Sequence, residues 1–346
     1  MTAQDVIAGT VNWSCECADA EAFLAMLPDD SIDLLFTSPP YLEARTYGID
    51  AGRKLEDWVA WMVRIVRLAS PKVRGLIAIN CEGQTRDYRY LPAPYLLMAD
   101  LHRLGFNLRR PAFFHRVGIP GSGGPDWLRA DVEPIICITR PGKLPWSDNT
   151  ACGHPPKWAP GGEMAHRLSD GTRTNQWGKP GSMTGTTATG NKEKQTIGKP
   201  RPSHHLSTRL GRNMCNGVPG STKGQCLSQP AIANPGNRIS LKVGGGMMGH
   251  ACAHANEAPF PLGLTAFFVK SFCRPNGIVL DPFCGSGTTL DAAIQNNRKA
   301  VGCDVRKSQV TLTEKRLRTV TPGIPGLGTE DSACHAKGNE SNLFRE

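Results

Sequence analysis

Segments with the apolar period of a helix alternate with short apolar runs along the first 140 or so residues. Residues 55–69 place Trp58, Met62, Ile65 and Val66 on one helical face, which is typical of an amphipathic helix. The pattern predicts helices over 18–28, 55–69 and 95–105, and strands over 31–37, 75–80, 109–117 and 132–139. Strands that alternate with helices predict an α/β fold, doubly wound, with a mostly parallel sheet covered on both faces.

The alternation stops near residue 145 and returns at Pro261. The intervening residues are rich in Gly, Pro, Thr and Asn, and 18 of the 38 glycines lie in residues 151–250. We therefore expect an insertion that is irregular or becomes ordered on binding. Beyond it the pattern predicts a helix over 262–273, a strand, tight loop and helix over 277–297, a strand over 299–305 and a helix over 308–320.

The net charge of +10 is concentrated in the insertion. Residues 151–250 contain 13 Lys and Arg but only 3 Asp and Glu, whereas the rest of the chain carries 27 of each kind. A segment that holds the whole basic excess is typical of contact with a polyanion such as nucleic acid, although a solvated loop with incidental charge also fits.

Cysteine usage and hydropathy limit where the chain can act. The 12 cysteines are scattered from Cys15 to Cys334 with no C-x-x-C pair, and the first ten residues do not form a secretory signal. No apolar run reaches the roughly 18 residues that a membrane span requires. We expect free thiols, a cytoplasmic location and no membrane partner.

A first candidate loop follows the predicted strand 31–37. There the apolar run breaks into "TSPPY", Thr37 to Tyr41, whose two prolines donate no backbone hydrogen bond and so end the strand. We expect a stiff, sharply turned loop that presents Ser38 and Tyr41.

A second candidate loop is "DPFCGSGTT", Asp281 to Thr289, between a predicted strand and helix. Gly285 and Gly287 permit positive φ and close approach of a ligand to the backbone, and the following helix offers free amide groups. Asp304 ends the next strand about twenty residues on, a spacing similar to that of dinucleotide sites in which the acid holds ribose hydroxyls. A tight turn without a ligand is the simpler alternative.

Together the two loops resemble those of the DNA amino-methyltransferases, which use S-adenosylmethionine (AdoMet) to methylate N4 of cytosine or N6 of adenine. The order of catalytic loop, variable segment and cofactor loop is similar to the circularly permuted β group of that family. The resemblance covers residues 15–140 and 250–320. It implies an AdoMet-dependent methyltransferase fold with a catalytic half (1–144), a target-recognition insertion (145–250), an AdoMet-binding half (251–322) and a polar tail (323–346).

The resemblance also implies roles for single residues. Asp19 matches the acid that contacts the adenine amino group of AdoMet, although the usual Gly-Asp is Ala-Asp here and Glu16 is an alternative. Phe283 matches the aromatic against the cofactor, and "HANEAPFPLGL", with Pro261, matches the motif before the cofactor loop. The implied cofactor-binding residues are Asp19, Thr37, Pro261, Asp281, Phe283, Gly285, Gly287, Thr288 and Asp304, and the implied catalytic residues are Ser38, Pro39, Pro40 and Tyr41.

The expected methylation of an exocyclic amine explains why the loop at residues 37–41 should be stiff. The lone pair of an exocyclic amine is delocalised into the base, so a loop that accepts both amine hydrogens favours the pyramidal, nucleophilic amine. We expect the Ser38 hydroxyl and the Pro39 carbonyl to be these acceptors, held in place by the prolines. Tyr41 would stack on a base flipped out of double-stranded DNA. Serine at the first loop position favours N4 of cytosine over N6 of adenine, by resemblance.

Other functions are also compatible with the sequence. A methyltransferase acting on RNA or on a protein amide, or a non-catalytic DNA-binding protein, would share many of these features. Covalent C5 methylation is disfavoured because the chain has no Pro-Cys dipeptide, and Cys284 lies in the cofactor loop. "HACAH", 250–254, is not expected to bind metal, since no second ligand cluster accompanies it. A prokaryotic or phage-encoded enzyme of restriction-modification, with a cognate restriction endonuclease, is the expected context.

Overall fold

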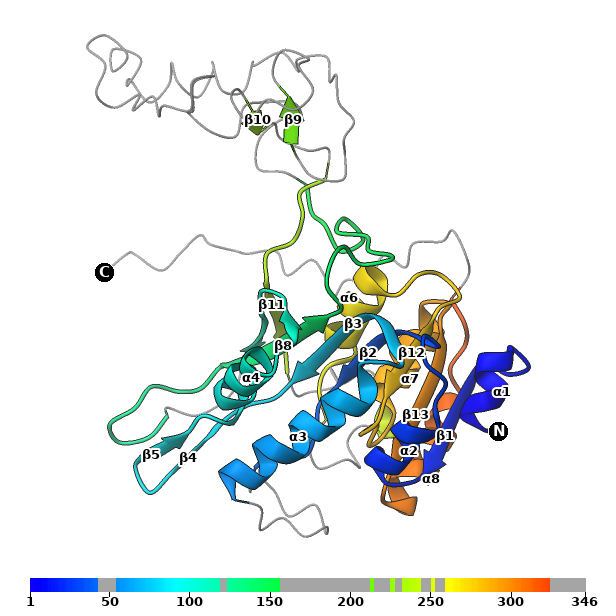
Figure 1. Ribbon diagram of the computed structural model, residues 1–346, viewed down its shortest axis with the longest axis horizontal. Coiled ribbons are helices and arrows are strands. Elements are labelled where there is room, and N and C mark those ends of the chain that lie inside the picture. Colours follow the sequence, from blue (N-terminus) through cyan, green and yellow to red (C-terminus); the bar gives the residue numbers. More distant parts are fainter. Residues whose placement is uncertain are drawn as a thin grey trace. The chain divides into compact units, whose positions relative to one another are not determined.

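The computed structural model describes residues 1–42, 54–118, 123–155, 212–214, 225–227, 232–243, 250–252 and 259–323. In this part of the chain the main sheet has nine strands (Figure 1). Their order is β1 (Trp13–Cys17), β13 (Lys299–Asp304), β12 (Ile278–Asp281), β2 (Ile32–Thr37), β3 (Val73–Asn80), β8 (Val132–Thr139), β7 (Ala112–Val117) and β11 (Arg238–Lys242), with β6 (Asn107–Leu108) beside β8.

The sheet is mostly parallel, which confirms the predicted fold class. Neighbouring strands from β1 to β3 are parallel, β8 is antiparallel to both β3 and β7, and β11 is parallel to β7. The carboxyl ends of β1, β13, β12, β2 and β3 therefore lie along one edge, where β8 begins. We call this the carboxyl edge. Open α/β sheets bind their ligands at such an edge.

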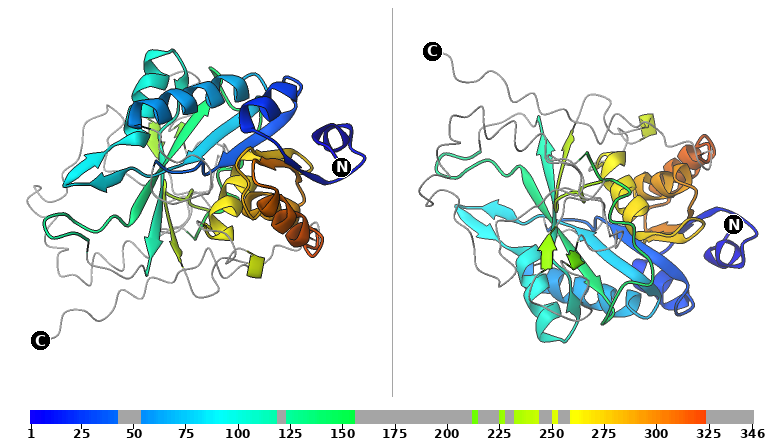
Figure 2. Two further views of the ribbon diagram at one scale, coloured as in Figure 1. Left: turned by 90° about the horizontal axis from the view of Figure 1, so that it is seen from below. Right: turned by 90° about the horizontal axis from the view of Figure 1, so that it is seen from above.

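Helices cover the sheet on two sides (Figure 2). One hydrophobic core cluster contains residues of α2 (Ala20–Met26), α3 (Leu55–Ala69) and α4 (Ala93–Arg103). A second cluster contains residues of α6 (Leu262–Phe272), α7 (Thr288–Gln295) and α8 (Lys307–Leu317). The predicted face of α3 is confirmed, because Trp58, Met62, Ile65 and Val66 are all buried.

The helices and strands predicted from the apolar pattern are present, and their ends differ from the predicted ones by no more than three residues. The pattern missed α1 (Ala3–Ala8), β1, β6, β11 and the hairpin of β4 (Gln84–Arg86) and β5 (Arg89–Leu91). These elements are short, and several lie at a sheet edge or outside the main sheet, so polar residues interrupt their apolar period. The strand β11 falls within 145–250 and yet joins the main sheet, pairing with β7 over five residues.

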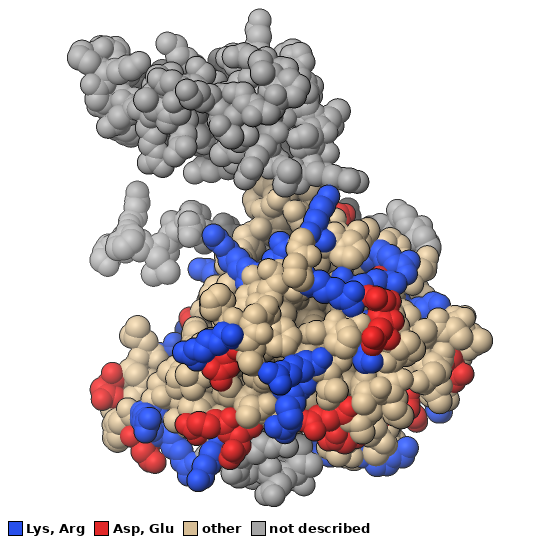
Figure 3. Space-filling view, in the orientation of Figure 1, with Lys and Arg blue, Asp and Glu red and all other residues tan. Residues whose placement is uncertain are grey.

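Residues 149–235 form a separate compact unit. Its described parts are the antiparallel pair β9 (Arg212–Met214) and β10 (Gln225–Leu227), and an isolated bridge between His154 and Ala233. Most of the basic residues of 151–250 lie outside the described residues. In the described part, the face shown in Figure 3 intersperses basic and acidic side chains, which agrees with the balanced charge outside the insertion.

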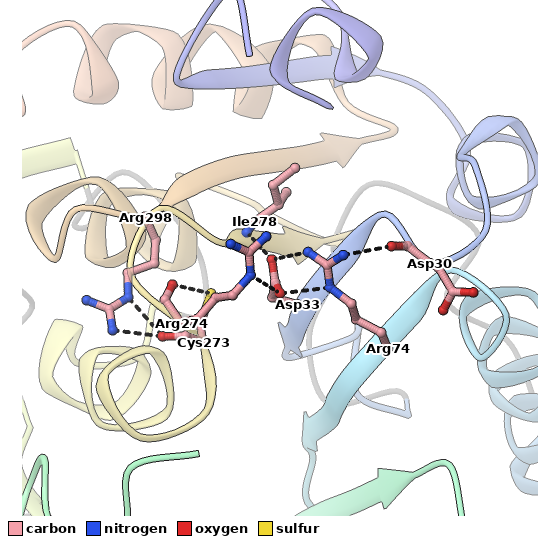
Figure 4. Close-up of polar contacts among 7 residues, drawn as sticks. All are labelled: Asp30, Asp33, Arg74, Cys273, Arg274, Ile278 and Arg298. Carbon is pink, nitrogen blue, oxygen red and sulfur yellow. Dashed lines mark hydrogen bonds and ion pairs between the residues drawn. The ribbon is translucent and has the colours of Figure 1, made fainter. Parts of the chain in front are cut away.

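A cluster of charged groups ties three central strands together at the end away from the carboxyl edge (Figure 4). Asp33 on β2 accepts two hydrogen bonds from Arg74 on β3, each 2.9 Å, and one of 3.0 Å from Arg274 before β12. It also accepts from the amide of Ile278 at 2.8 Å. Burial alone would raise the pKa of Asp33, but the hydrogen bonds from Arg74 and Ile278 outweigh it, and the pKa lies below its ordinary value.

In the described ranges, no helix is long and apolar enough to cross a bilayer.

Candidate active site

The two loops singled out in the sequence meet at the carboxyl edge. β2 and β12 are paired, Leu34 beside Val279 and Leu35 beside Leu280. At their ends the Thr37 hydroxyl donates a 2.6 Å hydrogen bond to Oδ1 of Asp281, and both side chains are buried. Residues 244 positions apart in the chain are thus in direct contact, which places loop 37–41, the predicted catalytic loop, beside loop 281–289, the predicted cofactor loop.

Asp281 is a buried carboxyl group with an altered acidity. Burial raises its pKa to about 6, and the charge of Asp304 adds to this, while hydrogen bonds, including that from Thr37, work in the opposite direction. Oδ1 also accepts from the amide of Phe283 at 3.0 Å. A buried carboxyl group beside a second acid favours a positively charged ligand nearby.

The cofactor loop adopts the backbone that its glycines permit. Gly285 has φ of 51° and Gly287 has φ of 80°, both in the left-handed region. Asp304 fastens the loop to β13, because its Oδ2 accepts from the amide of Gly285 at 3.1 Å. Its Oδ1 accepts from the amide of Arg306 at 2.9 Å. Oδ1 also accepts from Nε of Arg306 at 3.5 Å, so Oδ2 is the oxygen that keeps a further lone pair for a ligand hydroxyl.

Helix α8 forms hydrogen bonds to the predicted cofactor loop and to the first residue of α7. Thr313 donates a 2.7 Å hydrogen bond to the carbonyl of Gly285, and Arg316 donates one of 2.9 Å to the Thr288 hydroxyl. Arg316 also pairs with Asp291 of α7 at 2.6 Å, and both side chains are fully buried. A Cβ atom on Gly287 would lie 2.8 Å from Cγ2 of Thr313. Gly287 is therefore required for close packing against α8, a contact that the sequence did not show.

Asp19 lies at the carboxyl end of β1 and begins α2. Its Oδ1 accepts from the amides of Glu21 and Ala22, at 2.9 and 3.2 Å, as an N-cap. The neighbouring amide of Ala18 donates to the main-chain carbonyl of Asp304 at 3.2 Å, so Asp19 is close to the end of β13. The alternative, Glu16, accepts from the amide of Ala3 at 2.7 Å and is engaged by α1.

The remaining cofactor candidates also reach this edge. Phe283 is half-buried, and its ring meets that of Trp61 edge-on with centroids 5.3 Å apart. Pro261 begins α6, and the preceding Phe260 packs edge-on against Phe36 near the end of β2. The Cys284 thiol lies 3.5 Å from that of Cys15, and this contact together with burial raises its pKa, which is the opposite of what a nucleophile needs.

The predicted catalytic loop is held by a hydrogen bond from α3 and by one within the loop. The indole nitrogen of Trp58 on α3 donates a 2.8 Å hydrogen bond to the carbonyl of Pro40. Pro39 is buried, whereas Ser38 and Tyr41 are half-buried. The Ser38 hydroxyl donates to Oη of Tyr41 at 3.3 Å.

Sequence reasoning missed the polar cluster beneath Tyr41. Its hydroxyl donates a 2.9 Å hydrogen bond to Oε2 of Glu133, the second residue of β8. Nδ2 of Asn80, the last residue of β3, donates to both Tyr41 and Glu133, at 3.0 and 2.7 Å. Arg116 on β7 pairs with Oε1 of Glu133 at 3.2 Å. The sequence signal for this cluster was Glu133, a single acid at the start of an otherwise apolar strand. A charged residue that is buried in a strand usually has a partner.

In the "HACAH" segment, the described residue His250 makes one contact within the segment and one with the residues that follow α8. Nδ1 of His250 accepts from the amide of Cys252 at 3.0 Å, and Nε2 lies 3.2 Å from the Thr319 hydroxyl. Among the described residues, no group of three His, Cys, Asp or Glu side chains is placed to hold a metal ion. His254 lies outside the described residues.

Comparison with known proteins places these features in a family. The family model described as DNA methylase, of the N6/N4 type, matches residues 32–315. The type II methyltransferase M.PvuII of Proteus hauseri is 23% identical over 328 residues, which cover 89% of this chain and 84% of that protein. The solved structure titled PvuII DNA methyltransferase (cytosine-N4-specific) has a TM-score of 0.56 at 16% identity, covering 88% of this chain and 86% of that one, and shows the same fold.

Higher identity is confined to short stretches. The putative methylase YubD of Escherichia coli K12 is 42% identical over 52 residues, which cover 15% of this chain and 23% of YubD. The family model, by contrast, spans both loops and well over half of the chain. The protein therefore belongs to the DNA methylase family of the N6/N4 type, the AdoMet-dependent amino-methyltransferases that its two loop motifs predict.

Proposed function

We propose that the protein transfers a methyl group from AdoMet to the exocyclic amine of a base in double-stranded DNA, N4 of cytosine in preference to N6 of adenine. The observation that carries this proposal is the 2.6 Å hydrogen bond between Thr37 and Asp281. It joins the first residue of the catalytic loop to the first residue of the cofactor loop, so a methyl donor on one loop is adjacent to a base held on the other.

The residues present fit AdoMet, which carries positive charge on its sulfur and its amino group. Asp19, Asp281 and Asp304 stand at the carboxyl ends of three strands, β1, β12 and β13. Burial raises the pKa of Asp281, and the charge of Asp304 adds to this, so two acids lie close together where a positively charged group would be favoured. Gly285 and Gly287 supply the backbone for close approach, and the half-buried Phe283 supplies an aromatic surface.

The chain's own residues bind and orient the reacting groups. AdoMet, when bound, supplies a methyl carbon whose bond to sulfur breaks as its bond to the amine nitrogen forms, and the amine then loses one proton to solvent. Ser38 and the Pro39 carbonyl accept the two amine hydrogens and direct the lone pair, while Trp58 fixes the loop through Pro40. The Tyr41 ring offers a face on which the flipped base stacks, worth about 1–3 kcal/mol.

A test separates binding from transfer. Ser38→Ala is expected to bind AdoMet normally and to lose most methyl transfer, because the hydroxyl faces the amine and not the cofactor. Calorimetric titration with AdoMet and transfer of labelled methyl to DNA measure the two properties. A Ser38→Ala variant with the full transfer rate would remove this residue from the chemistry, and a wild-type protein that methylates no DNA would overturn the function.

The base preference rests on Ser38, the first residue of the catalytic loop, and a relative of the same fold carries the name cytosine-N4-specific. Digestion of methylated DNA to nucleosides, followed by mass spectrometry, should show N4-methylcytosine. N6-methyladenine alone would overturn the preference but leave the assignment as an amino-methyltransferase intact.

The 145–250 insertion is proposed as the target-recognition region, since the basic excess lies within it. The cytoplasmic location and the cognate restriction endonuclease remain predictions that follow from the restriction-modification context of the type II relatives. Sequencing of DNA from cells that express the gene, with detection of modified bases, would give the recognition sequence that such an endonuclease must share.

A further inference from the structure

The hydroxyl of Ser38 is one end of a chain of hydrogen bonds that ends on a buried carboxylate. Ser38 contacts Oη of Tyr41 at 3.3 Å, and Tyr41 contacts Oε2 of Glu133 at 2.9 Å. The Glu133 side chain is buried at the start of β8, which is separated from β2 by one strand, β3, along the same edge of the sheet. The family motif explains Ser38 and Tyr41 but does not explain Glu133.

The chemistry of Glu133 sets the direction of this chain. A carboxylate only accepts hydrogen bonds, and Oε1 of Glu133 is paired with Arg116 at 3.2 Å. The Tyr41 hydroxyl must therefore donate its proton to Glu133. Burial and the neighbouring Glu133 raise the pKa of Tyr41 well above its ordinary value, so this proton stays on the phenol.

Asn80 reinforces the same direction. Its Nδ2 donates to Oε2 of Glu133 at 2.7 Å and to Oη of Tyr41 at 3.0 Å. The opposite amide orientation would turn a carbonyl oxygen toward the carboxylate, which is repulsive. With its own proton on Glu133, the Tyr41 oxygen can only accept from its other neighbours, Asn80 and Ser38. The Ser38 proton consequently points to Tyr41, and the serine lone pairs remain free.

We propose that Glu133 is a positioning residue that acts through Tyr41 to hold the Ser38 hydroxyl as a hydrogen-bond acceptor for the substrate amine. This inference rests on the proposed function, in which that amine must be met by acceptors. A free serine hydroxyl can rotate and donate its proton to a ring nitrogen of the base. The chain removes this alternative before the base arrives, which is preorganisation.

The decisive variant is Tyr41→Phe, because it keeps the aromatic ring for stacking and deletes only the oxygen that receives the Ser38 proton. We expect kcat for methyl transfer to fall about tenfold, the effect of removing one hydrogen bond that matters in the transition state. The Kd for AdoMet and the KM for DNA should stay within twofold. Glu133→Gln should behave in the same way, and circular dichroism must show that it remains folded.

A double-mutant cycle distinguishes positioning from a general effect on structure. In a Ser38→Ala background, Tyr41→Phe and Glu133→Gln should each change kcat by less than twofold, since the hydroxyl they orient is absent. Tyr90→Phe is the matched control. It deletes another tyrosine hydroxyl that contacts a carboxylate, Glu82 at 3.1 Å, without a link to Ser38. Its kcat should equal that of the wild type.

The outcomes separate this inference from the proposed function. Additive losses in the cycle, or a Tyr41→Phe variant with wild-type kcat, would overturn the role of the Glu133 chain while the enzyme remains a methyltransferase. A wild-type protein that transfers no methyl group to DNA would overturn the proposed function and this inference with it. A loss in kcat that disappears when Ser38 is removed is the result expected.

Discussion

At the scale of single residues, two features of the structure require glycine at position 287. Its φ of 80° is unfavourable for other residues, and a Cβ atom there would lie 2.8 Å from Thr313. The sequence indicates only that a cofactor approaches this backbone. The structure shows that the adjacent space on the Cβ side is occupied by helix α8, so a substitution displaces the loop itself.

We predict that Gly287→Ala weakens AdoMet binding at least tenfold, because the loop must shift to relieve the contact with Thr313. Gly142→Ala is the matched control, since Gly142 has φ of 95° but a Cβ atom there would meet no atom of the other described residues within 4 Å. It should cost about 1–2 kcal/mol of stability from backbone strain and leave AdoMet affinity unchanged. Calorimetric titration measures both affinities. Equal affinities for the Gly287→Ala variant and the wild type would contradict the role of this loop.

The ligand-free protein is predicted to become less stable as pH rises, because the buried carboxyl group of Asp281 loses its proton. Its pKa is raised from 3.8 to about 6, so the folded state holds a proton that the unfolded state has already released. Stability is therefore lost as pH rises from about 4 to about 6, by roughly 3 kcal/mol at most. Asp281→Asn should raise the melting temperature of the ligand-free protein at pH 8 and leave it nearly unchanged near pH 4.

The Asp281→Asn variant should also bind AdoMet more weakly. The negative charge of Asp281 destabilises the ligand-free site, but it would attract the positively charged cofactor. Thermal denaturation at several pH values, with and without AdoMet, measures both effects. A stability difference between Asp281→Asn and the wild type that does not vary with pH would show that this carboxyl group titrates normally.

At the scale of elements, α8 matters because it anchors the cofactor loop to the body of the sheet. Arg316 is fully buried, pairs with Asp291 on α7 and reaches the Thr288 hydroxyl. Thr313, one turn earlier, contacts the carbonyl of Gly285. The loop conformation is thus determined by a helix that begins after β13, and not by the loop sequence alone.

We predict that Arg316→Ala lowers the free energy of unfolding by about 3–5 kcal/mol, because Asp291 is left buried without its partner. The control is Arg318→Ala, whose exposed side chain lies 4.0 Å from Glu314 and should contribute no more than about 0.5 kcal/mol. Urea denaturation compares the two. An Arg316→Ala variant as stable as Arg318→Ala would mean that the buried pair contributes nothing net.

For the whole molecule, the concentration of the basic excess in residues 151–250 predicts that this segment binds the DNA phosphates. The part outside 151–250 is balanced, and the described residues on the face shown in Figure 3 include side chains of both signs. Lys192, Lys194 and Lys199, with Arg201, Arg209 and Arg212, are candidates for phosphate binding. The first five lie outside the described residues, and only the backbone of Arg212, in β9, is described.

Changing Lys192, Lys194 and Lys199 to Gln should weaken DNA binding and reduce the slope of log affinity against log salt by roughly 0.9 for each phosphate that is no longer neutralised. A matched triple variant of exposed arginines in the other unit, Arg64, Arg103 and Arg318, should leave the slope unchanged. Fluorescence anisotropy with a labelled duplex at several salt concentrations provides the measurement. An unaltered slope in the lysine variant would exclude these residues as phosphate ligands.

Much of this protein is determined by local sequence. The long amphipathic helix 55–69 and the buried strands 31–37 and 132–139 were predictable because apolar periodicity reports directly on which face is buried. The two loops were predictable because proline ends strands and because glycine permits positive φ. Their order along the chain was enough to indicate the family.

Only the tertiary structure decided which distant groups meet. The contact between Thr37 and Asp281, 244 positions apart, depends on β12 lying beside β2. The link from Ser38 to Glu133 depends on β8 running antiparallel to β3, which brings the start of one strand to the end of the other. Strand order and direction follow from how the whole core packs, so no local pattern of residues encodes them.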